Sequence, residues 1–240
     1  MSLSFNLDSY VDWIEKEAQS GSSRFDLFSV DYVKSHQIRY AKTIDLIDRC
    51  QASSALEVGA TDFFQIYLAA ARGINNTWAT IFSNNIENKY YRKSFYAAGY
   101  EANSQVVSIN LENELLPIGE ENFDLILFCE VIEHLDEPRL AALEKIVFKY
   151  AKPIDVIVTT PNAEYNKKFE GLSAGQMRHS DHRFEWTRAE FEQWGNRIAE
   201  EYNYDVVYKP VGEEDPEVGA LTQMALFTTK QRTIALNRFL

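Results

Sequence analysis

The sequence has few basic residues for its length, and acidic residues outnumber them. Lys and Arg together number 24 against 36 Asp and Glu, which gives a formal net charge of −12 at pH 7. That is the wrong sign for a protein that tracks along a nucleic-acid backbone, because such binding rests on many phosphate contacts. The charge remains compatible with an enzyme that contacts its substrate through only a few basic groups.

The sequence is also poor in cysteine and has no long apolar run. Its two cysteines, Cys50 and Cys129, have neither metal-binding nor redox spacing, so we expect buried thiols in a reducing compartment. No apolar stretch approaches the roughly 18 residues that span a bilayer. The N-terminus, MSLSFNLDSY, lacks the charged and apolar regions of a signal peptide. We therefore expect a soluble cytoplasmic protein with no membrane partner.

What is present suits one globular domain. The chain has 240 residues, of which 45% are hydrophobic and 13% aromatic, enough for a sizeable core and against disorder. Residues 1–35 carry scattered aromatics and a polar GSS break, which predicts a short helical extension. We expect the remaining residues, 36–240, to form the main domain.

Apolar runs alternate with helical patterns along this domain. Five runs predict buried strands: SALEVGA (54–60), WATIFS (78–83), QVVSIN (105–110), FDLILF (123–128) and DVIVTT (155–160). Helical spacing marks residues 37–50, residues 138–151 and a helix that begins at Thr187. Two final strands, 204–211 and 222–229, flank the turn-rich EEDPEVG. This order predicts an α/β fold with a doubly wound, mostly parallel seven-stranded sheet and an antiparallel edge strand.

A first group of candidate ligands follows the fourth predicted strand. The string EVIEH places Glu130, Glu133 and His134 at helical spacing, so one turn of helix would put them on one face. Carboxylate and imidazole ligands indicate a divalent ion such as Mg²⁺, Mn²⁺ or Fe²⁺ rather than an all-sulfur zinc site. The alternative is that these side chains only hydrogen-bond the backbone, since similar strings occur in methyltransferases that bind no metal.

A second group lies in the loop before the helix at Thr187. The string RHSDHRFEWTR (178–188) gathers two histidines, an aspartate, a glutamate and three arginines around two aromatics. His182 is the best candidate for a fourth metal ligand, and the alternative is a capped turn or a surface ion-pair cluster. Basic residues are dense here, which favours either an RNA contact or a solvated loop: Lys167, Lys168, Arg178, Arg183 and Arg188.

With TTPNAEYN between them, these two strings resemble the small-RNA 3′-terminal 2′-O-methyltransferases. The resemblance runs from about Phe123 to Phe227 and includes EEDPEVGALTQMALF. It implies a class I fold that uses S-adenosylmethionine. It also implies a catalytic set that holds one divalent ion, Mg²⁺ or Mn²⁺: Glu130, Glu133, His134 and His182.

The cofactor half matches this family less well. A class I methyltransferase has an acidic-x-Gly-x-Gly-x-Gly loop after its first strand, and here Glu57 and Gly59 match while Thr61 and Phe63 replace the later glycines. The acidic residue that usually ends the second strand is also absent. Either the cofactor binds in a modified way or this half has lost it. We expect five residues to bind S-adenosylmethionine: Glu57, Gly59, Asp62, Ser83 and Asn110.

The resemblance, together with the candidate ligands, implies a metal-dependent enzyme that methylates the 2′-hydroxyl of the 3′-terminal ribose of RNA. A ribose hydroxyl is a poor nucleophile at neutral pH, which explains the use of a metal. Arg178 is a candidate phosphate contact, and Thr160, Pro161 and Asn162 are expected to shape the substrate pocket. The expected partner is an RNA 3′ end and not DNA. Two alternatives are a glycan or small-molecule methyltransferase and an RNA-end binding module that has lost catalysis.

Overall fold

The computed structural model describes residues 43, 46, 47, 49–59, 74, 76–81, 104–108 and 123–232. The predicted N-terminal extension, residues 1–35, lies outside the described residues. The same holds for three of the predicted cofactor residues, Asp62, Ser83 and Asn110. Residues 123–232, which include the candidate metal ligands, are described without a gap.

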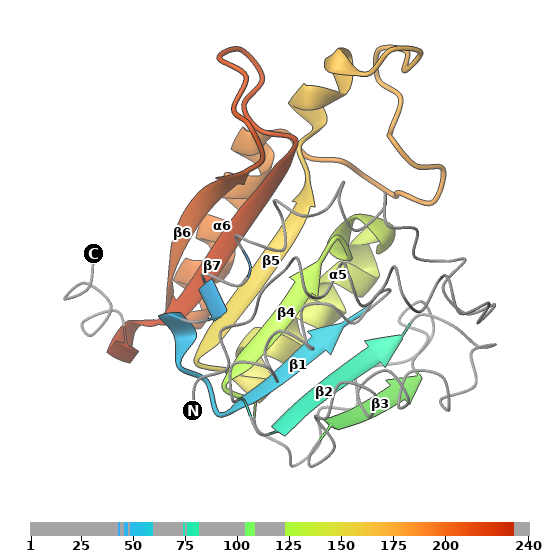
Figure 1. Ribbon diagram of the computed structural model, residues 1–240. Coiled ribbons are helices and arrows are strands. Elements are labelled where there is room, and N and C mark those ends of the chain that lie inside the picture. Colours follow the sequence, from blue (N-terminus) through green and yellow to red (C-terminus); the bar gives the residue numbers. More distant parts are fainter. Residues whose placement is uncertain are drawn as a thin grey trace, which may run out of the picture.

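One sheet organises the described residues, with the strand order β3-β2-β1-β4-β5-β7-β6 (Figure 1). Its strands are β1 (Ser54–Val58), β2 (Asn76–Ile81), β3 (Ser104–Ser108), β4 (Leu125–Cys129), β5 (Asp155–Pro161), β6 (Tyr204–Val211) and β7 (Thr222–Thr229). Pairing is parallel from β3 through β5. All seven strands overlap the strands predicted from the sequence, so the predicted fold class is confirmed.

The antiparallel strand stands in a different place from the one predicted. It is β7, which pairs antiparallel with both β5 and β6 and so lies second from the edge. Most residues of β7 are buried, and such a strand needs neighbours on both sides. The edge strand is β6, in which Val207 and Lys209 are exposed to solvent.

Alternating side chains build a core on each face of the sheet. In β4, Ile126 and Phe128 belong to one buried cluster, while Leu125 and Leu127 belong to the other. This follows from the period of two along a strand, and it explains why the β4 sequence is apolar at every position. The helices α5 (Glu137–Glu144) and α6 (Arg188–Tyr202) cover the first of these faces (Figure 1).

The helix predicted over 138–151 is present, but its second half is wider than an α-helix. After α5 the chain continues as the π-helical segment η2 (Lys145–Ala151). The Lys152 amide donates to the Val147 carbonyl at 2.8 Å, a bond across five residues that closes the wider turn. Lys152 itself adopts a left-handed conformation, with φ of 50°, and ends the segment.

The carboxyl ends of β4 and β5 lead into the segments that carry the candidate site. After β4 comes the short 3₁₀ helix η1 (Ile132–His134), and after β5 come η3 (Ala163–Lys168) and a loop over residues 169–187. These segments and the β6–β7 loop extend beyond the same end of the sheet (Figure 1). Ligands of open α/β sheets bind at this end. Within the described part of the chain, no helix is long and apolar enough to cross a membrane.

Candidate metal centre

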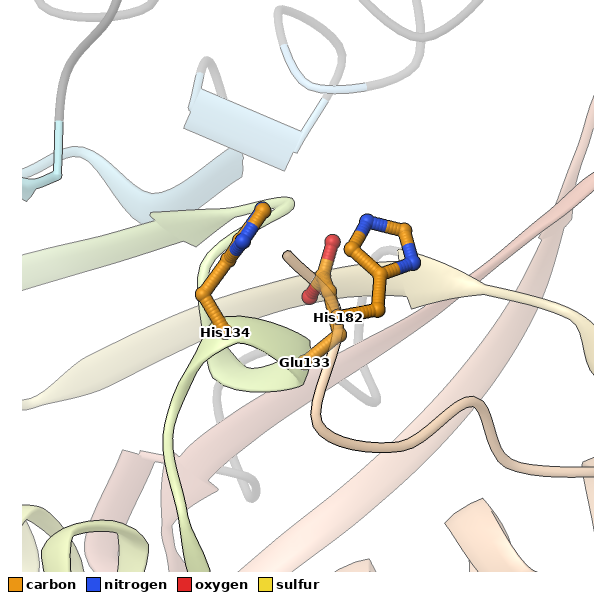
Figure 2. Close-up of side chains that lie close together, drawn as sticks. All are labelled: Glu133, His134 and His182. Carbon is orange, nitrogen blue, oxygen red and sulfur yellow. The ribbon is translucent and has the colours of Figure 1, made fainter. Parts of the chain in front are cut away.

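Three of the four predicted ligands lie together at the carboxyl end of β4. One ligand atom each from Glu133, His134 and His182 falls within 4.8 Å of the others. Figure 2 shows the three side chains converging, two from η1 and one from the loop over 169–187. The rings of His134 and His182 meet edge to face, with centroids 4.8 Å apart. The structure therefore joins two strings that lie far apart in the sequence.

Glu130 stands beside this cluster and is not one of its three members. The expectation that Glu130, Glu133 and His134 share one helical face is wrong, because η1 begins only at Ile132. The Glu130 amide still bonds to Thr159 of β5, and Glu130 turns the chain with φ of 57°. The chain is thus bound to the sheet at Glu130 and becomes helical only after it.

Two hydroxyls of β5 hold the two glutamates. Thr160 donates to Glu133 Oε2 at 3.0 Å, and Thr159 donates to Glu130 Oε1 at 2.9 Å. The Glu133 side chain is fully buried, at 0% exposure. A buried carboxylate needs such donors, because burial without them carries a large desolvation cost. Thr160 thus contacts a candidate ligand, and its predicted role in the substrate pocket stays a prediction.

His182 is held by a carboxylate, Glu185, that was not predicted from the sequence as part of the site. The His182 Nδ1 atom lies 2.6 Å from Glu185 Oε1, and the Glu185 side chain is only 2% exposed. Burial alone would raise the pKa of Glu185, but hydrogen bonds from Asn166, His182 and the Arg178 amide hold it below its usual value. The signal in the sequence was the H-x-x-E spacing, which brings a glutamate back to the histidine.

His134 is the more open of the two histidines. Its Nδ1 atom lies 3.3 Å from Asp181 Oδ2, and the two side chains are 27% and 58% exposed. Burial and the neighbouring His182 and His179 rings lower the pKa of His134, while Asp181 opposes them. The net shift favours the neutral imidazole, which is the form that binds a metal.

Arg178 and Asn162 are engaged inside the protein. The Arg178 guanidinium donates to Asn166 Oδ1 at 2.6 Å, to the Leu221 carbonyl at 2.9 Å and to the Asn162 carbonyl. The Asn162 amide donates to the carbonyls of Val218 and Ala220, each at 2.8 Å. Both residues therefore join β5 to the β6–β7 loop, and the predicted phosphate and substrate contacts stay predictions. Pro161 ends β5 and pairs in register with Thr222.

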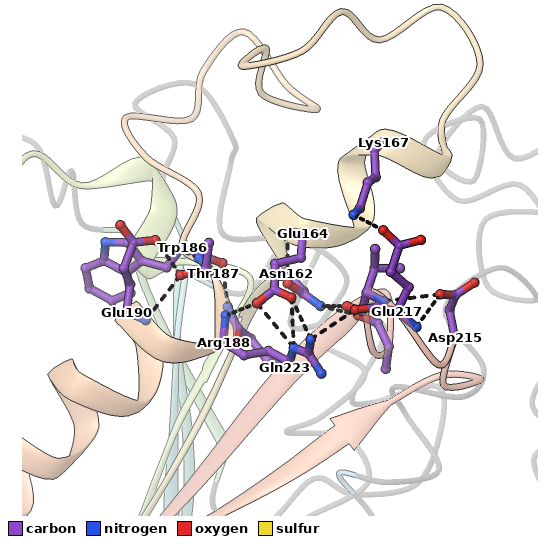
Figure 3. A network of polar contacts seen from close by, with 12 residues as sticks. Asn162, Glu164, Lys167, Trp186, Thr187, Arg188, Glu190, Asp215, Glu217 and Gln223 are labelled. Carbon is purple, nitrogen blue, oxygen red and sulfur yellow. Dashed lines mark hydrogen bonds and ion pairs between the residues drawn. The ribbon is translucent and has the colours of Figure 1, made fainter.

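Most of the basic residues predicted to be dense near the site are paired with acids. Their ion pairs link η3 and the start of α6 to the β6–β7 loop and to each other: Lys167–Glu217 at 2.6 Å, Lys168–Asp215 at 2.7 Å and Arg188–Glu164 at 2.6 Å. Figure 3 shows the first and last of these, together with the capping box of Thr187 and Glu190. Arg183 lies 4.0 Å from Asp181. Local basic density thus does not amount to a free positive surface.

Two of the five predicted cofactor residues, Glu57 and Gly59, lie among the described residues. Glu57 is buried in β1, and Gly59 follows the strand with φ of 70°, a conformation that glycine adopts without strain. Because β1 pairs with β4, with Val58 opposite Phe128, this turn stands beside the turn at Glu130. Gly59, the last described residue of the predicted cofactor loop, therefore lies at the same end of the sheet as the candidate metal ligands.

Comparison with known proteins places these features in a family. No protein-family model matches the chain. A small RNA 2′-O-methyltransferase of Xenopus tropicalis is 42% identical over 109 residues, 44% of this chain and 29% of that protein. The mouse protein of the same name is 43% identical over 109 residues, 44% of this chain and 27% of its own length. The chain thus spans less than a third of the length of these curated relatives.

A solved structure covers more of the chain. The crystallised methyltransferase domain of a bacterial Hen1 protein, CtHen1-C, is 30% identical, with a TM-score of 0.69, and the match covers 81% of this chain and 98% of that domain. The chain belongs to the small RNA 2′-O-methyltransferase family. The resemblance inferred from the sequence is confirmed. The same fold occurs in a magnesium protoporphyrin IX methyltransferase of Synechocystis, which is 10% identical to this chain with a TM-score of 0.61.

Proposed function

We propose that this chain transfers a methyl group from S-adenosylmethionine to the 2′-hydroxyl of the 3′-terminal ribose of an RNA, and that it needs a divalent metal to do so. One observation carries the proposal. A buried carboxylate and two imidazoles, from Glu133, His134 and His182, converge at the carboxyl end of β4 in a member of this family. That is where an α/β sheet places its ligands.

The residues fit a divalent ion by the chemistry of their donor atoms. Two nitrogen donors and a carboxylate oxygen lie within 4.8 Å of one another, close enough for one ion to contact all three. We propose Glu130 as the fourth ligand, since it stands at the turn just before η1. Mixed imidazole and carboxylate ligands suit Mn²⁺ at least as well as Mg²⁺. When bound, the ion stabilises the negative charge that develops on a ribose oxygen.

The protonation state and orientation of the candidate ligands are set by neighbouring residues of the protein itself. Burial and the neighbouring histidines lower the pKa of His134 and so keep its ring neutral near pH 7. Thr160 fixes the Glu133 carboxylate through its hydroxyl. Groups held in this way need little rearrangement when substrate binds, which is how orientation contributes to rate.

We propose that S-adenosylmethionine binds at the turn after β1. The support is the position of Gly59, whose positive φ bends the chain beside the turn at Glu130. Glu57 belongs to the same proposal, with Asp62, Ser83 and Asn110 as further cofactor residues predicted from the sequence. Neighbouring sites for methyl donor and acceptor are what an in-line transfer requires.

A terminal ribose is the proposed target because it alone offers two free neighbouring hydroxyls. The test uses three RNAs of one sequence that end in a 2′,3′-diol, a 3′-phosphate or a 2′-deoxy sugar, with S-adenosylmethionine carrying a labelled methyl group. We expect label only in the diol RNA, and we expect its product to resist periodate oxidation. Equal labelling of the blocked RNAs would point to internal methylation and overturn the terminal specificity.

A second candidate function is methyl transfer to a glycan or small molecule. The observation that favours it is the pairing of Lys167, Lys168 and Arg188 with carboxylates. A glycan or small molecule with neighbouring hydroxyls needs no free basic surface. The discriminating experiment offers such diols and the RNA to the same protein in competition. Loss of RNA labelling without loss of total methyl transfer would favour the second candidate. Absence of S-adenosylmethionine binding would instead favour an RNA-end binding module.

A further inference from the structure

We infer that Glu185 is a positioning residue, which fixes the ring of His182 so that its Nε2 atom faces the metal site. This inference rests on the proposed function, because the role of His182 as a ligand does. The observation behind it is the 2.6 Å contact between His182 Nδ1 and a Glu185 carboxylate that is 2% exposed. A contact this short, with both partners buried, is far stronger than a surface ion pair.

The contact determines which nitrogen of His182 carries the proton in the neutral ring. An ionised carboxylate only accepts hydrogen bonds, and Glu185 Oε1 already accepts the Arg178 amide at 2.7 Å. His182 Nδ1 must therefore be the donor in this pair. The lone pair of the neutral ring is then left on Nε2, on the opposite side of the ring from Glu185. Histidines that bind metals are oriented in this way by a partner of their other nitrogen.

Glu185 is itself held on both of its oxygens. Oε1 accepts from the Arg178 amide and Oε2 accepts from the side-chain amide of Asn166. The Arg178 side chain in turn donates to Asn166 Oδ1 and to the Leu221 carbonyl. The Glu185 carboxylate is thus fixed by residues from three segments: η3, the loop over residues 169–187 and the end of the β6–β7 loop. The orientation of His182 is set by this whole arrangement.

His134 offers a comparison inside the same site. Its carboxylate partner, Asp181, is 58% exposed and 3.3 Å away, so solvent competes for both groups. The same type of contact is therefore weaker at His134 than at His182. We expect Asp181→Asn to weaken metal binding much less than removal of the Glu185 carboxylate does.

The first experiment needs no metal. Nitrogen-15 NMR of the metal-free protein reports which ring nitrogen of each histidine carries the proton. We expect the proton of neutral His182 on Nδ1, and we expect Glu185→Ala to release that preference without changing His134. A His182 proton on Nε2 in the unaltered protein would overturn the inference. A residue that merely stabilised the loop would not change this signature.

The second experiment separates the hydrogen bond from the fold. In the double variant Glu185→Gln with Asn166→Asp, amide and carboxylate exchange places, and the net charge is unchanged. The new amide oxygen can still accept from His182 and from the Arg178 amide, while its NH₂ group donates to the carboxylate at position 166. The longer bond from Asn166 to the Gln176 carbonyl, at 3.3 Å, is given up. Thermal unfolding identifies variants that fold.

Calorimetric titration with Mn²⁺ then measures the effect on the site. We expect Glu185→Ala to bind Mn²⁺ about 10–100-fold more weakly, as for other partners of metal-binding histidines. The exchanged pair should recover most of that loss, because it keeps an acceptor at Nδ1. Unchanged affinity in a folded Glu185→Ala variant, or no recovery in a folded exchanged pair, would overturn the inference.

A control variant is available, and failure of the proposed function can be distinguished from failure of this inference. Glu201→Gln removes an exposed carboxylate of α6 that lies 3.5 Å from Arg197, and it should leave both measurements unchanged. If the unaltered protein binds no Mn²⁺, the proposed function fails. The proton position on His182 would still decide whether Glu185 orients that ring.

Discussion

At the scale of single residues, the site depends on hydroxyl groups as much as on its candidate ligands. Thr159 and Thr160, neighbours in β5, donate to Glu130 and Glu133. Side chains of consecutive strand residues point to opposite faces of a sheet. The two glutamates are therefore fixed from different directions at the end of β5.

We expect Thr160→Val to destabilise the metal-free protein by about 1–3 kcal/mol, the usual cost of removing a hydrogen bond from a buried charged group. Valine has nearly the shape of threonine, so the change removes the hydroxyl and little else. Urea unfolding measures the loss. Thr159→Val is the matched control and should cost less, because Glu130 is half-buried whereas Glu133 is fully buried. Equal stability of Thr160→Val and the parent would contradict this role.

The four proposed ligands should act as one unit. Each single alanine substitution of Glu130, Glu133, His134 or His182 should abolish methyl transfer, because an incomplete set misplaces the ion. His179→Ala is the control. Its Nδ1 atom accepts the Asp181 amide at 3.1 Å, and its ring centroid lies 5.5 Å from that of His182. An inactive His179→Ala beside an active His182→Ala would show that the wrong histidine was chosen.

The sequence was sufficient to nominate Glu133, His134 and His182, because their residue types and local strings carry the signal. It did not identify Glu185 or the supporting role of Asn166. The H-x-x-E spacing carries a local signal for Glu185, whereas the role of Asn166 depends on contacts between segments that lie 12 to 43 residues apart, such as Arg178 with Asn166 and with Leu221. No local pattern specifies such contacts, so only the folded arrangement reveals them.

At the scale of elements, the β6–β7 loop contacts η3, the segment that precedes the loop carrying His182. Asp215 accepts hydrogen bonds from Lys168 of η3 and from the amides of Glu217 and Val218 within the loop. These donors, with Lys168 the strongest, lower the pKa of Asp215 to about 2. The carboxylate form therefore stabilises both the loop and its contact with η3.

This gives a prediction for acid unfolding. The pKa of Asp215 in the folded protein lies below its ordinary value of 3.8, so the stabilisation from its carboxylate is present above about pH 4 and is lost as the pH falls toward 2. We expect the parent to melt slightly above Asp215→Asn near neutral pH, by a small margin because the pair is at the surface. The two melting curves should converge on acidification. A difference that stays constant or grows would contradict the assignment.

Apolar runs located every strand of the sheet, because burial between two layers leaves a continuous apolar signal. Three features escaped that signal. The place of β7 depends on pairing between segments that lie far apart in the chain, and the 3₁₀ turn of η1 depends on the bond of Glu130 to β5. The widened end of the helix over 138–151 is defined by hydrogen bonds across five residues, such as the one from Lys152 to Val147. Each of these three features depends on tertiary contacts or local backbone geometry, which the residue types alone do not specify.

At the scale of the whole molecule, charge limits how RNA can be held. The net charge is −12, and Lys167, Lys168 and Arg188 already pair with carboxylates. We therefore expect few phosphate contacts. For one or two such contacts with single-stranded RNA, the slope of log affinity against log salt should be about −1.5 or shallower. Fluorescence anisotropy between about 50 and 200 mM salt measures it, and a much steeper slope would indicate an extended phosphate track.

The central claim is that methyl transfer depends on a divalent ion held by Glu133, His134 and His182. The most direct measurement is the rate of methyl transfer to an RNA with a 3′-terminal diol, first in excess chelator and then after Mn²⁺ is restored. The account predicts no transfer in chelator and full recovery on restoration, with no recovery in a folded His182→Ala variant. Undiminished transfer in excess chelator would contradict it.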